Sequence, residues 1–330
     1  LIKRILFYLD YTQFVYNKFL KNRASFKDKI LMQFIKYYIF LVLTVLFWSG
    51  NFIFGRLVSN SIEPLQLSFF RWFFVFIILL PYILIHYKNI LKVFKKEYLV
   101  LLVLATLAIS GFNTFLYYGL QTTTATNALL INSSTPIFII IFSAFIFKTI
   151  ITKIQFLGVL ISTFGVIYLI LKGQINHILD LEFTIGDLWI IAASVDWALY
   201  SVLLKYKPKE LNSFEFFSIT TLLGTFILFI AFIFQGYSFE FSFLNNEEVF
   251  YSMIYIVIFP SILSFYFWNR AILELGANKA GQFTHLMPIF GAVLAYIFLG
   301  ELMQGYHIIG IIFISIGIYL SIFLKKVKIK

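Results

Sequence analysis

The 330-residue chain contains no cysteine, only six prolines and few charged residues. Without cysteine it can hold no disulfide, no cysteine-ligated iron–sulfur cluster and no thiolate zinc site. Charged residues make up 12% of the sequence, about half of the share in soluble domains, whereas hydrophobic residues make up 61%. So little charge cannot cover a water-soluble protein of this size. The composition excludes disulfide-rich secreted, fibrous and disordered classes and indicates an integral membrane protein.

The chain also lacks the sequence signatures of several kinds of chemistry. It has no glycine-rich phosphate loop followed by Lys and Ser or Thr, so ATP does not drive it directly. It has no Ser/His/Asp arrangement, no paired carboxylates within its apolar segments and no HExxH motif, which argues against an intramembrane protease or lipid hydrolase. The four histidines lack metal-ligand spacing. We therefore expect no enzyme activity, no cofactor and no metal.

Ten segments are long and apolar enough to cross a membrane, because a span needs about 20 mostly apolar residues. Short loops separate them, so we expect no inserted soluble domain. The predicted fold is an all-α membrane protein with ten transmembrane helices. The predicted spans are 37–55, 64–86, 98–119, 123–147, 154–171, 186–204, 214–235, 248–269, 278–299 and 305–324.

The positions of the 26 Lys and Arg residues, which give a formal net charge of +11, indicate the direction of the chain. If the N-terminus is cytoplasmic, all of them lie on the cytoplasmic side except Arg56 and Lys172 in outer loops and Arg71 within a span. Cytoplasmic loops of membrane proteins carry an excess of Lys and Arg. The sequence thus predicts cytoplasmic N- and C-termini. Since the charges follow the loops and do not gather on one face, we expect no nucleic-acid partner.

Residues 1–36 form a basic and aromatic extension before the first span. One interpretation is an amphipathic helix attracted to anionic lipid. The other is a dispensable segment or a wrongly assigned start, because the chain begins with Leu1 and Met32 lies just before the first span. Both interpretations stay open.

An internal repeat relates residues 37–171 to residues 184–324. A shift of 149 places Trp48 on Trp197, and a shift of 152 aligns two longer stretches. The pairs at 152 are Ala125 with Ala277, Pro136-Ile137-Phe138 with Pro288-Ile289-Phe290, Gly158 with Gly310, and Gly165 with Gly317. The glycine spacing indicates close helix packing. Each half holds five spans, an odd number, so the second half is inverted. Inverted repeats are common in secondary transporters, with the substrate near the midplane between the halves.

Ordered motifs accompany this repeat. The second half contains Phe267-Trp268-Asn269, Ala271, Leu275-Gly276-Ala277, Pro288, Leu299-Gly300-Glu301, Gly310 and Gly317. The first half contains Phe47-Trp48-Ser49-Gly50-Asn51-Phe52, Arg71 and Pro136. Together they resemble the EamA family of the drug/metabolite transporter superfamily over roughly residues 37–324. One departure is that the acid Glu301 has Thr149 as its first-half counterpart, whereas many relatives carry Gly-Glu in both halves.

The resemblance implies two inverted five-helix repeats around a central cavity, with a pseudo-twofold axis in the membrane plane. Helices 1, 3, 4, 6, 8 and 9 would line the cavity. It also implies export of amino acids, metabolites or drugs across the bacterial inner membrane by secondary transport.

Pro136 and Pro288 lie near the centres of the fourth and ninth predicted spans. Proline lacks an N–H and clashes with the preceding turn, so the carbonyls of Asn132 and Thr284 lose their usual partners. Lipid cannot satisfy such carbonyls. Either the two kinks form paired walls of a cavity, or they are packing kinks whose carbonyls bond to local hydroxyls.

Asp196 is the only acid deep inside a predicted span, so we expect it to face the interior or a water-filled cavity. It could bind a substrate amine, carry a coupling proton or serve as a structural polar group. His285 could also titrate with a transported proton, or be a neutral buried histidine. Arg71 could attract a substrate carboxylate or have a structural role. For Glu301 we expect helix capping or interhelix bonding.

The sequence predicts a secondary transporter of a small metabolite or amino acid that works by alternating access. We expect it to be an exporter. Proton coupling through Asp196 or His285 is a weaker hypothesis, membrane lipids are expected partners, and the oligomeric state stays open. The alternative function is an accessory or lipid-carrier subunit that requires a partner. The candidate substrate-pathway residues are Trp48, Asn51, Asn113, Asn132, Asp196, Tyr200, Asn269 and His285, with kinks at Pro136 and Pro288 and structural polar residues Arg71 and Glu301.

Overall fold

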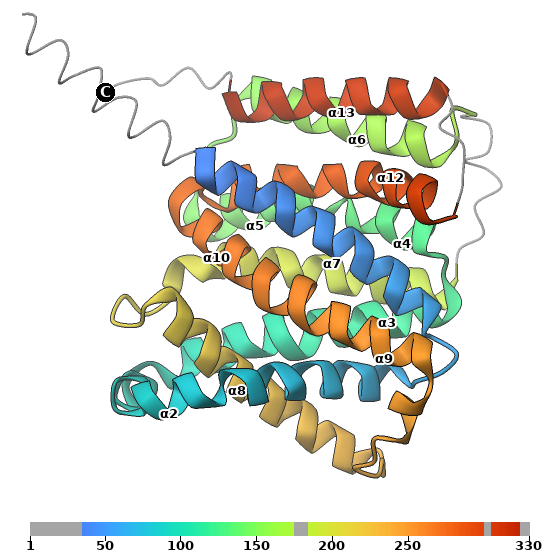
Figure 1. The fold of residues 1–330 in the computed structure, drawn as a ribbon. Coiled ribbons are helices and arrows are strands. Elements are labelled where there is room, and N and C mark those ends of the chain that lie inside the picture. Colours follow the sequence, from blue (N-terminus) through green and yellow to red (C-terminus); the bar gives the residue numbers. More distant parts are fainter. Residues whose placement is uncertain (1–34, 175–183, 300–304, 324–330) are drawn as a thin grey trace, which may run out of the picture.

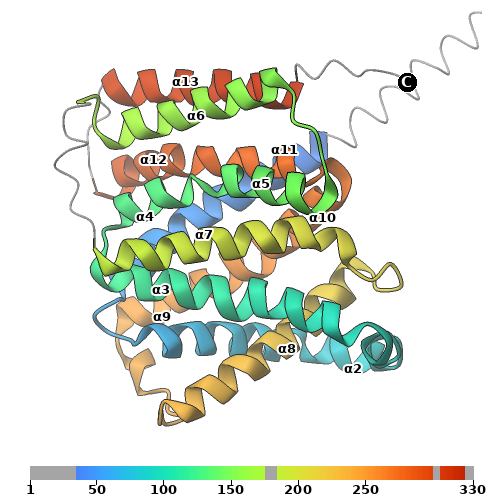
Figure 2. The same ribbon diagram turned by 180° about the vertical axis from the view of Figure 1, so that it is seen from behind.

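The computed structural model describes residues 35–174, 184–299 and 305–323. Within these ranges every regular element is a helix (Figures 1 and 2). Six of the helices are long and apolar enough to cross a membrane, and two shorter apolar helices cover 135–147 and 153–169. Large apolar side chains such as Phe145, Ile150 and Phe234 are more than 80% exposed. An outer surface of this kind is suited to lipid as its solvent.

The first half runs from the helix Ile35–Leu57 through six labelled elements. These are α2 (Pro64–Ala105), the π-helix η1 (Thr106–Gly111), α3 (Phe112–Thr122), α4 (Ala125–Asn132), α5 (Thr135–Phe147) and α6 (Lys153–Ile170).

The second half repeats this order. Its elements are α7 (Ile185–Leu203), the 3₁₀ turn η3 (Leu204–Tyr206), α8 (Ser213–Phe234), the 3₁₀ turn η4 (Ser242–Asn245), α9 (Glu247–Ile256), the π-helix η5 (Val257–Leu263), α10 (Ser264–Leu275), α11 (Ala277–Gly281), the 3₁₀ segment η6 (Gln282–Leu286), α12 (Met287–Leu299) and α13 (Gly305–Phe323).

Two of the predicted spans meet without a loop. The sequence predicts a break between spans 64–86 and 98–119, and the two helices within Pro64–Thr122 meet at a sharp bend at Glu97, which leaves helical φ/ψ with φ −123° and ψ 28°. The two arms fold back on one another at this bend. The hydroxyls of Ser68 and Thr114, one on each arm, lie 2.9 Å apart. The residues around Glu97 are good helix formers with no Gly or Pro, so nothing in the sequence ends the helix there.

The fourth and ninth predicted spans are each divided, at positions related by the repeat. Span 123–147 is divided into α4 and α5 around Ser133 and Ser134, and span 278–299 into α11, η6 and α12. Pro136 and Pro288 lie directly after these divisions, in the first turns of α5 and α12. Two turn residues precede α5, whereas η6 runs into α12 without an intervening turn, so Pro288 lies where a 3₁₀ segment changes to an α-helix.

The connections between helices alternate between the two ends of the bundle. The bend in α2 and the connections α5–α6, α7–α8 and α10–α11 all lie at the left end in Figure 1. These segments carry Lys95, Lys148, Lys205 and Lys279. We call this end the basic end.

The repeat is also visible in how the outer helices pair. Helices α6 and α13 pack together at one edge of the bundle, and α2 and α8 pack at the opposite edge (Figures 1 and 2). A Cβ atom built on Gly158 would lie 2.6 Å from the carbonyl oxygen of Gly317, and one built on Gly165 would lie 3.0 Å from that of Gly310. Because the repeat relates Gly158 to Gly310 and Gly165 to Gly317, each contact is the symmetry mate of the other. The predicted role of these glycines in close packing is confirmed.

We expect Gly317→Ala to lower the stability of the protein by about 1–3 kcal/mol, because a side chain there would force two backbones apart. The ideal Cβ would lie 2.5 Å from the Gly158 carbonyl oxygen, and a backbone cannot turn away as a flexible side chain can. The matched control is Gly305→Ala, at the start of the same helix, where nothing lies within 4 Å. Thermal unfolding of the purified variants in detergent measures the difference. Equal melting temperatures for the two variants would contradict the close contact.

Candidate substrate site at the centre of the bundle

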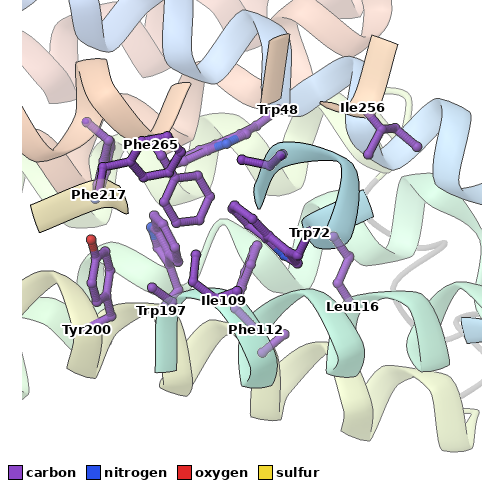
Figure 3. Packing of buried hydrophobic residues seen from close by; sticks show 14 of the residues in the cluster. Trp48, Trp72, Ile109, Phe112, Leu116, Trp197, Tyr200, Phe217, Ile256 and Phe265 are labelled. Carbon is purple, nitrogen blue, oxygen red and sulfur yellow. The ribbon is translucent and has the colours of Figure 1, made fainter. Parts of the chain in front are cut away.

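The centre of the bundle is closed by aromatic side chains. A void of about 10 Å³ lies between the two halves, and it has room for about one water molecule. Its lining residues are Trp48, Asn51, Phe52, Phe112, Asn132, Trp197, Thr284 and Met287. The rings of Trp48 and Trp197, which the repeat relates, meet edge to face at 4.9 Å between centroids, and Phe112 packs on Trp197 at 4.8 Å (Figure 3). Among the described residues, this void leaves no space for a metabolite.

A larger cavity of about 530 Å³ lies at the basic end. It is enclosed by the ends of α5, α7 and α10 and the starts of α6 and α11. Its lining residues are Ser143, Phe147, Thr149, Ile150, Gln155, Ser201, Val202, Lys205, Ile272, Leu273, Leu275, Gly276, Ala277, Asn278 and Lys279. None of these described lining residues is acidic.

Trp268 lies between the void and the basic-end cavity. Its indole N–H donates to the hydroxyl of Ser201 at 3.3 Å, and Ser201 lines the cavity. Its ring lies 5.0 Å from that of Trp48, which lines the void. Trp268 is fully buried. Trp268 thus contacts one residue of each lining.

Two buried amide–phenol pairs lie at positions that the repeat relates. In the first half, the Tyr117 hydroxyl donates to Asn51 Oδ1 at 3.0 Å. In the second half, the Tyr200 hydroxyl donates to Asn269 Oδ1 at 2.6 Å. The shift of 149 relates Asn51 to Tyr200, and the shift of 152 relates Tyr117 to Asn269. The same hydrogen bond is thus made in both halves with the two residue types exchanged.

Arg71 joins the first-half pair. Its side chain is 1% exposed, and its guanidinium donates to Ser261 Oγ at 2.6 Å, Tyr117 Oη at 2.7 Å and Asn51 Oδ1 at 3.2 Å. Because Asn51 lines the void, Arg71 is separated from the void by one side chain. The guanidinium points into the bundle, where its partners are polar side chains.

The two helix breaks are joined across the repeat by His285. Its Nε2 lies 2.9 Å from the carbonyl oxygen of Ser133, the residue that the shift of 152 relates to it, and its Nδ1 lies 2.6 Å from Ser162 Oγ. At the first break the Thr135 hydroxyl donates to the Asn132 carbonyl at 2.6 Å. That carbonyl therefore bonds to a local hydroxyl, as expected if the prolines are packing kinks. The side chains of Asn132 and Thr284 line the void, as expected if the prolines form cavity walls.

Asp196 lies outside both cavities. One turn of α7 directs Trp197 and Tyr200 to the centre, so Asp196 is directed instead at η1. A Cβ built on Gly111 would lie 3.0 Å from each of its carboxylate oxygens, and the carboxylate accepts a hydrogen bond from the Phe112 N–H. Oδ2 is buried with no hydrogen-bond partner. Asp196 therefore faces the interior of the bundle, as expected, but it is directed at the π-helix behind the void and does not line the void itself.

The remaining candidates have less central positions. Asn113 is fully buried but donates to the carbonyls of Ala108 and Ile109 in the π-helical region of its own segment, at 3.2 and 3.4 Å. It does not line the void. Glu301 lies outside the described residues. Within the described ranges, no group of three or more His, Asp or Glu side chains is placed to hold a metal ion.

Sequence reasoning missed Tyr117, Ser261 and Ser162, which supply partners to Arg71 and His285. A signal for Tyr117 was present, because the repeat relates it to Asn269 and Asn51 to Tyr200. An alignment scored by identity cannot show it, since the residue types are exchanged.

The arrangement of two related halves around a closed centre is matched by a family model. The model of the EamA-like transporter family matches residues 35–171 and again residues 184–323. The chain belongs to the EamA-like transporter family. The resemblance expected from the motifs is thereby confirmed.

Relatives of this EamA-like protein have the names of transporters. It is 27% identical over 290 residues to the uncharacterized transporter YetK of Bacillus subtilis strain 168, covering 88% of this chain and 87% of YetK. An uncharacterized transporter of Archaeoglobus fulgidus is 27% identical over 291 residues, covering 87% of this chain and 97% of the relative. These names indicate a transporter rather than an enzyme.

A solved crystal structure has the same fold as this EamA-like protein. It superposes with a TM-score of 0.64 at 17% sequence identity, over 86% of this chain and 96% of the other. Together with the apolar helices, the family membership identifies a multi-pass membrane transporter.

Proposed function

We propose that this EamA-like protein is a secondary transporter that exports a small metabolite or amino acid across the bacterial inner membrane. In this proposal two inverted repeats of five spans alternate between conformations that open the centre to one side and then to the other. The basic end of the bundle faces the cytoplasm, and the N- and C-termini are cytoplasmic.

The observation that carries the proposal is a cavity on one side of a closed centre. The basic-end cavity of about 530 Å³ is large enough for a small metabolite, whereas the void beyond Trp268 is about 10 Å³. Alternating access requires such a barrier between the substrate site and one side of the membrane. The exchanged amide–phenol pairs and the paired glycine contacts support two equivalent halves that can rock against each other.

Transport by the purified protein tests the proposal. The protein reconstituted alone into liposomes should exchange a labelled substrate from a panel of amino acids and small organic acids, and protein-free liposomes should not. An accessory or lipid-carrier subunit would show no exchange until its partner is added. Exchange by the isolated chain would therefore exclude the accessory function, and its absence for every compound would contradict the transporter proposal.

The absence of cysteine makes the orientation directly measurable. We expect Asn278→Cys, which lines the basic-end cavity, to react with a membrane-impermeant maleimide in inside-out vesicles and not in intact cells. Asn60→Cys, an exposed residue between the first helix and α2, should show the reverse. The parent chain supplies an unlabelled background. Labelling of both variants from the same side would contradict the proposed orientation.

A further inference from the structure

Arg71 is a buried positive charge, and no described residue beside it carries the opposite charge. It is 1% exposed, and its hydrogen-bond partners in the described part of the chain, Ser261, Tyr117 and Asn51, are neutral side chains. Its guanidinium also lies 5.1 Å from the ring centre of Trp72. None of the ion pairs among the described residues includes Arg71. A buried ion is costly unless an opposite charge compensates it, and neutral dipoles compensate it only in part.

The second half shows that the fold does not need this charge. Arg71 and Thr220 are the eighth residues of α2 and α8, which the repeat relates by the shift of 149. The Thr220 hydroxyl only donates to carbonyls of its own helix. The Tyr200–Asn269 hydrogen bond nevertheless forms, at 2.6 Å and without a cation. The guanidinium is therefore an addition of the first half and not a requirement for the amide–phenol pair.

The position of Arg71 connects it to the route through the bundle. Asn51, which accepts a hydrogen bond from Arg71, lines the central void. An anion that entered an expanded void could replace Asn51 Oδ1 as the acceptor. The basic-end cavity, whose lining includes Lys205 and Lys279, would favour the entry of anions from that side.

The surroundings also indicate which anion fits. Arg71 supplies one positive charge behind Asn51, and the described residues that line the void include no cation. A carboxylate brings one negative charge and neutralises the site, whereas a phosphate monoester brings about −1.5 to −2 at pH 7 and leaves an excess. The aromatic residues of the void wall suit an apolar body behind the carboxylate. We propose that Arg71 binds the carboxylate of an amphipathic organic acid or amino acid as the transported substrate. This inference rests on the proposed transport function.

A carboxylate introduced by substitution beside Arg71 tests, without any ligand, whether Arg71 lacks a counter-charge. Asn51→Asp keeps the shape of the side chain and places a carboxylate on Arg71, so we expect its melting temperature to rise by about 2–5 °C. The matched control is Asn269→Asp, where a carboxylate would meet only Tyr200 and no cation, so its melting temperature should fall. If both variants lose stability to the same extent, Arg71 does not lack a counter-charge and the inference is wrong.

Ligand binding tests the substrate class. Thermal shifts of the purified wild type are measured with two pairs of probes that differ at the carboxylate, phenylacetate with phenylacetamide and leucine with leucinamide. We expect a carboxylate to stabilise the wild type and its amide to bind at least tenfold more weakly. Asn51→Asp should lose carboxylate binding at least tenfold, because its own carboxylate occupies Arg71. Arg71→Gln, which keeps a hydrogen-bond donor but no charge, should lose the preference for the acid.

The two proposals fail in different ways. If no probe acid binds, if acids and amides bind equally, or if Asn51→Asp binds acids normally, the role of Arg71 is wrong. If the reconstituted protein exchanges labelled amines or neutral compounds but no acid, the inference fails while the transport function stands. If acids bind through Arg71 but the protein exchanges none of them, the transport function fails while the binding site stands.

Discussion

His285→Ala is expected to destabilise the protein by about 3–5 kcal/mol and to abolish transport. The substitution removes a fully buried ring whose two nitrogens reach Ser133 in the first break and Ser162 in α6. The loss combines the cavity left by the ring with a buried carbonyl that has lost its partner. Because the two breaks are related by the repeat, this one side chain fixes the halves at their contact.

The control is His86→Ala, which makes the same chemical change at a histidine whose Nδ1 contacts only the Tyr82 carbonyl one turn earlier. His285→Gln should recover part of the stability, because its amide nitrogen can still donate to the Ser133 carbonyl. Thermal unfolding and liposome exchange measure both properties. A His285→Ala variant as stable as His86→Ala would show that the breaks are held by other contacts.

Much of the architecture could be predicted from the sequence because it depends on composition and on rare residues. The low charge and the apolar segments predict an all-helical membrane protein, and the paired glycines predict close helix packing, although not which helices meet. The number of ten spans stays a prediction. The second and third predicted spans meet at a bend at Glu97 with no loop between them. No turn residue marks that bend, so the sequence could place two spans there but not the way they join.

Pro136 and Pro288 mark the two divided spans, but the sequence could not show how each span is divided. A proline in an apolar segment is compatible with a kink or with the first turn of a new helix. The choice depends on contacts far away in the sequence, such as that between His285 and the carbonyl of Ser133. The two amide–phenol pairs could not be found from the sequence for a similar reason. The repeat keeps the hydrogen bond between an amide and a phenol but exchanges the positions of Asn and Tyr.

The direction of Asp196 could not be predicted from its position in a span. A helix turns by about 100° per residue, so the neighbour of a central residue can face a different element. Trp197 faces the void, whereas Asp196 faces Gly111 and the Phe112 N–H. Phe112 in turn lines the void and packs on Trp197. In this conformation Asp196 does not line the void, so we infer that coupling by Asp196 acts through the π-helix.

The last prediction follows from that position. We expect Asp196→Asn to remain folded, because the amide oxygen can still accept from the Phe112 N–H, and to exchange substrate at equal concentrations as the wild type does. Stimulation of transport by an imposed proton gradient should fall on the order of tenfold, a typical size for coupling between two sites. The physical reason is that Asp196 has a buried oxygen without a partner and, among the described ion pairs, no cation, so gain or loss of its proton changes the bond at the end of η1.

Glu274→Gln is the control, because this acid at the basic end is paired with Arg270 at 3.9 Å and touches neither the void nor η1. It should keep the full response to the gradient. A pH-sensitive dye inside the liposomes measures proton movement together with substrate movement. If Asp196→Asn still moves protons with the substrate, coupling does not pass through the π-helix. If the wild type itself shows no response, the hypothesis of proton coupling is wrong, while exchange at equal concentrations would still support a transporter.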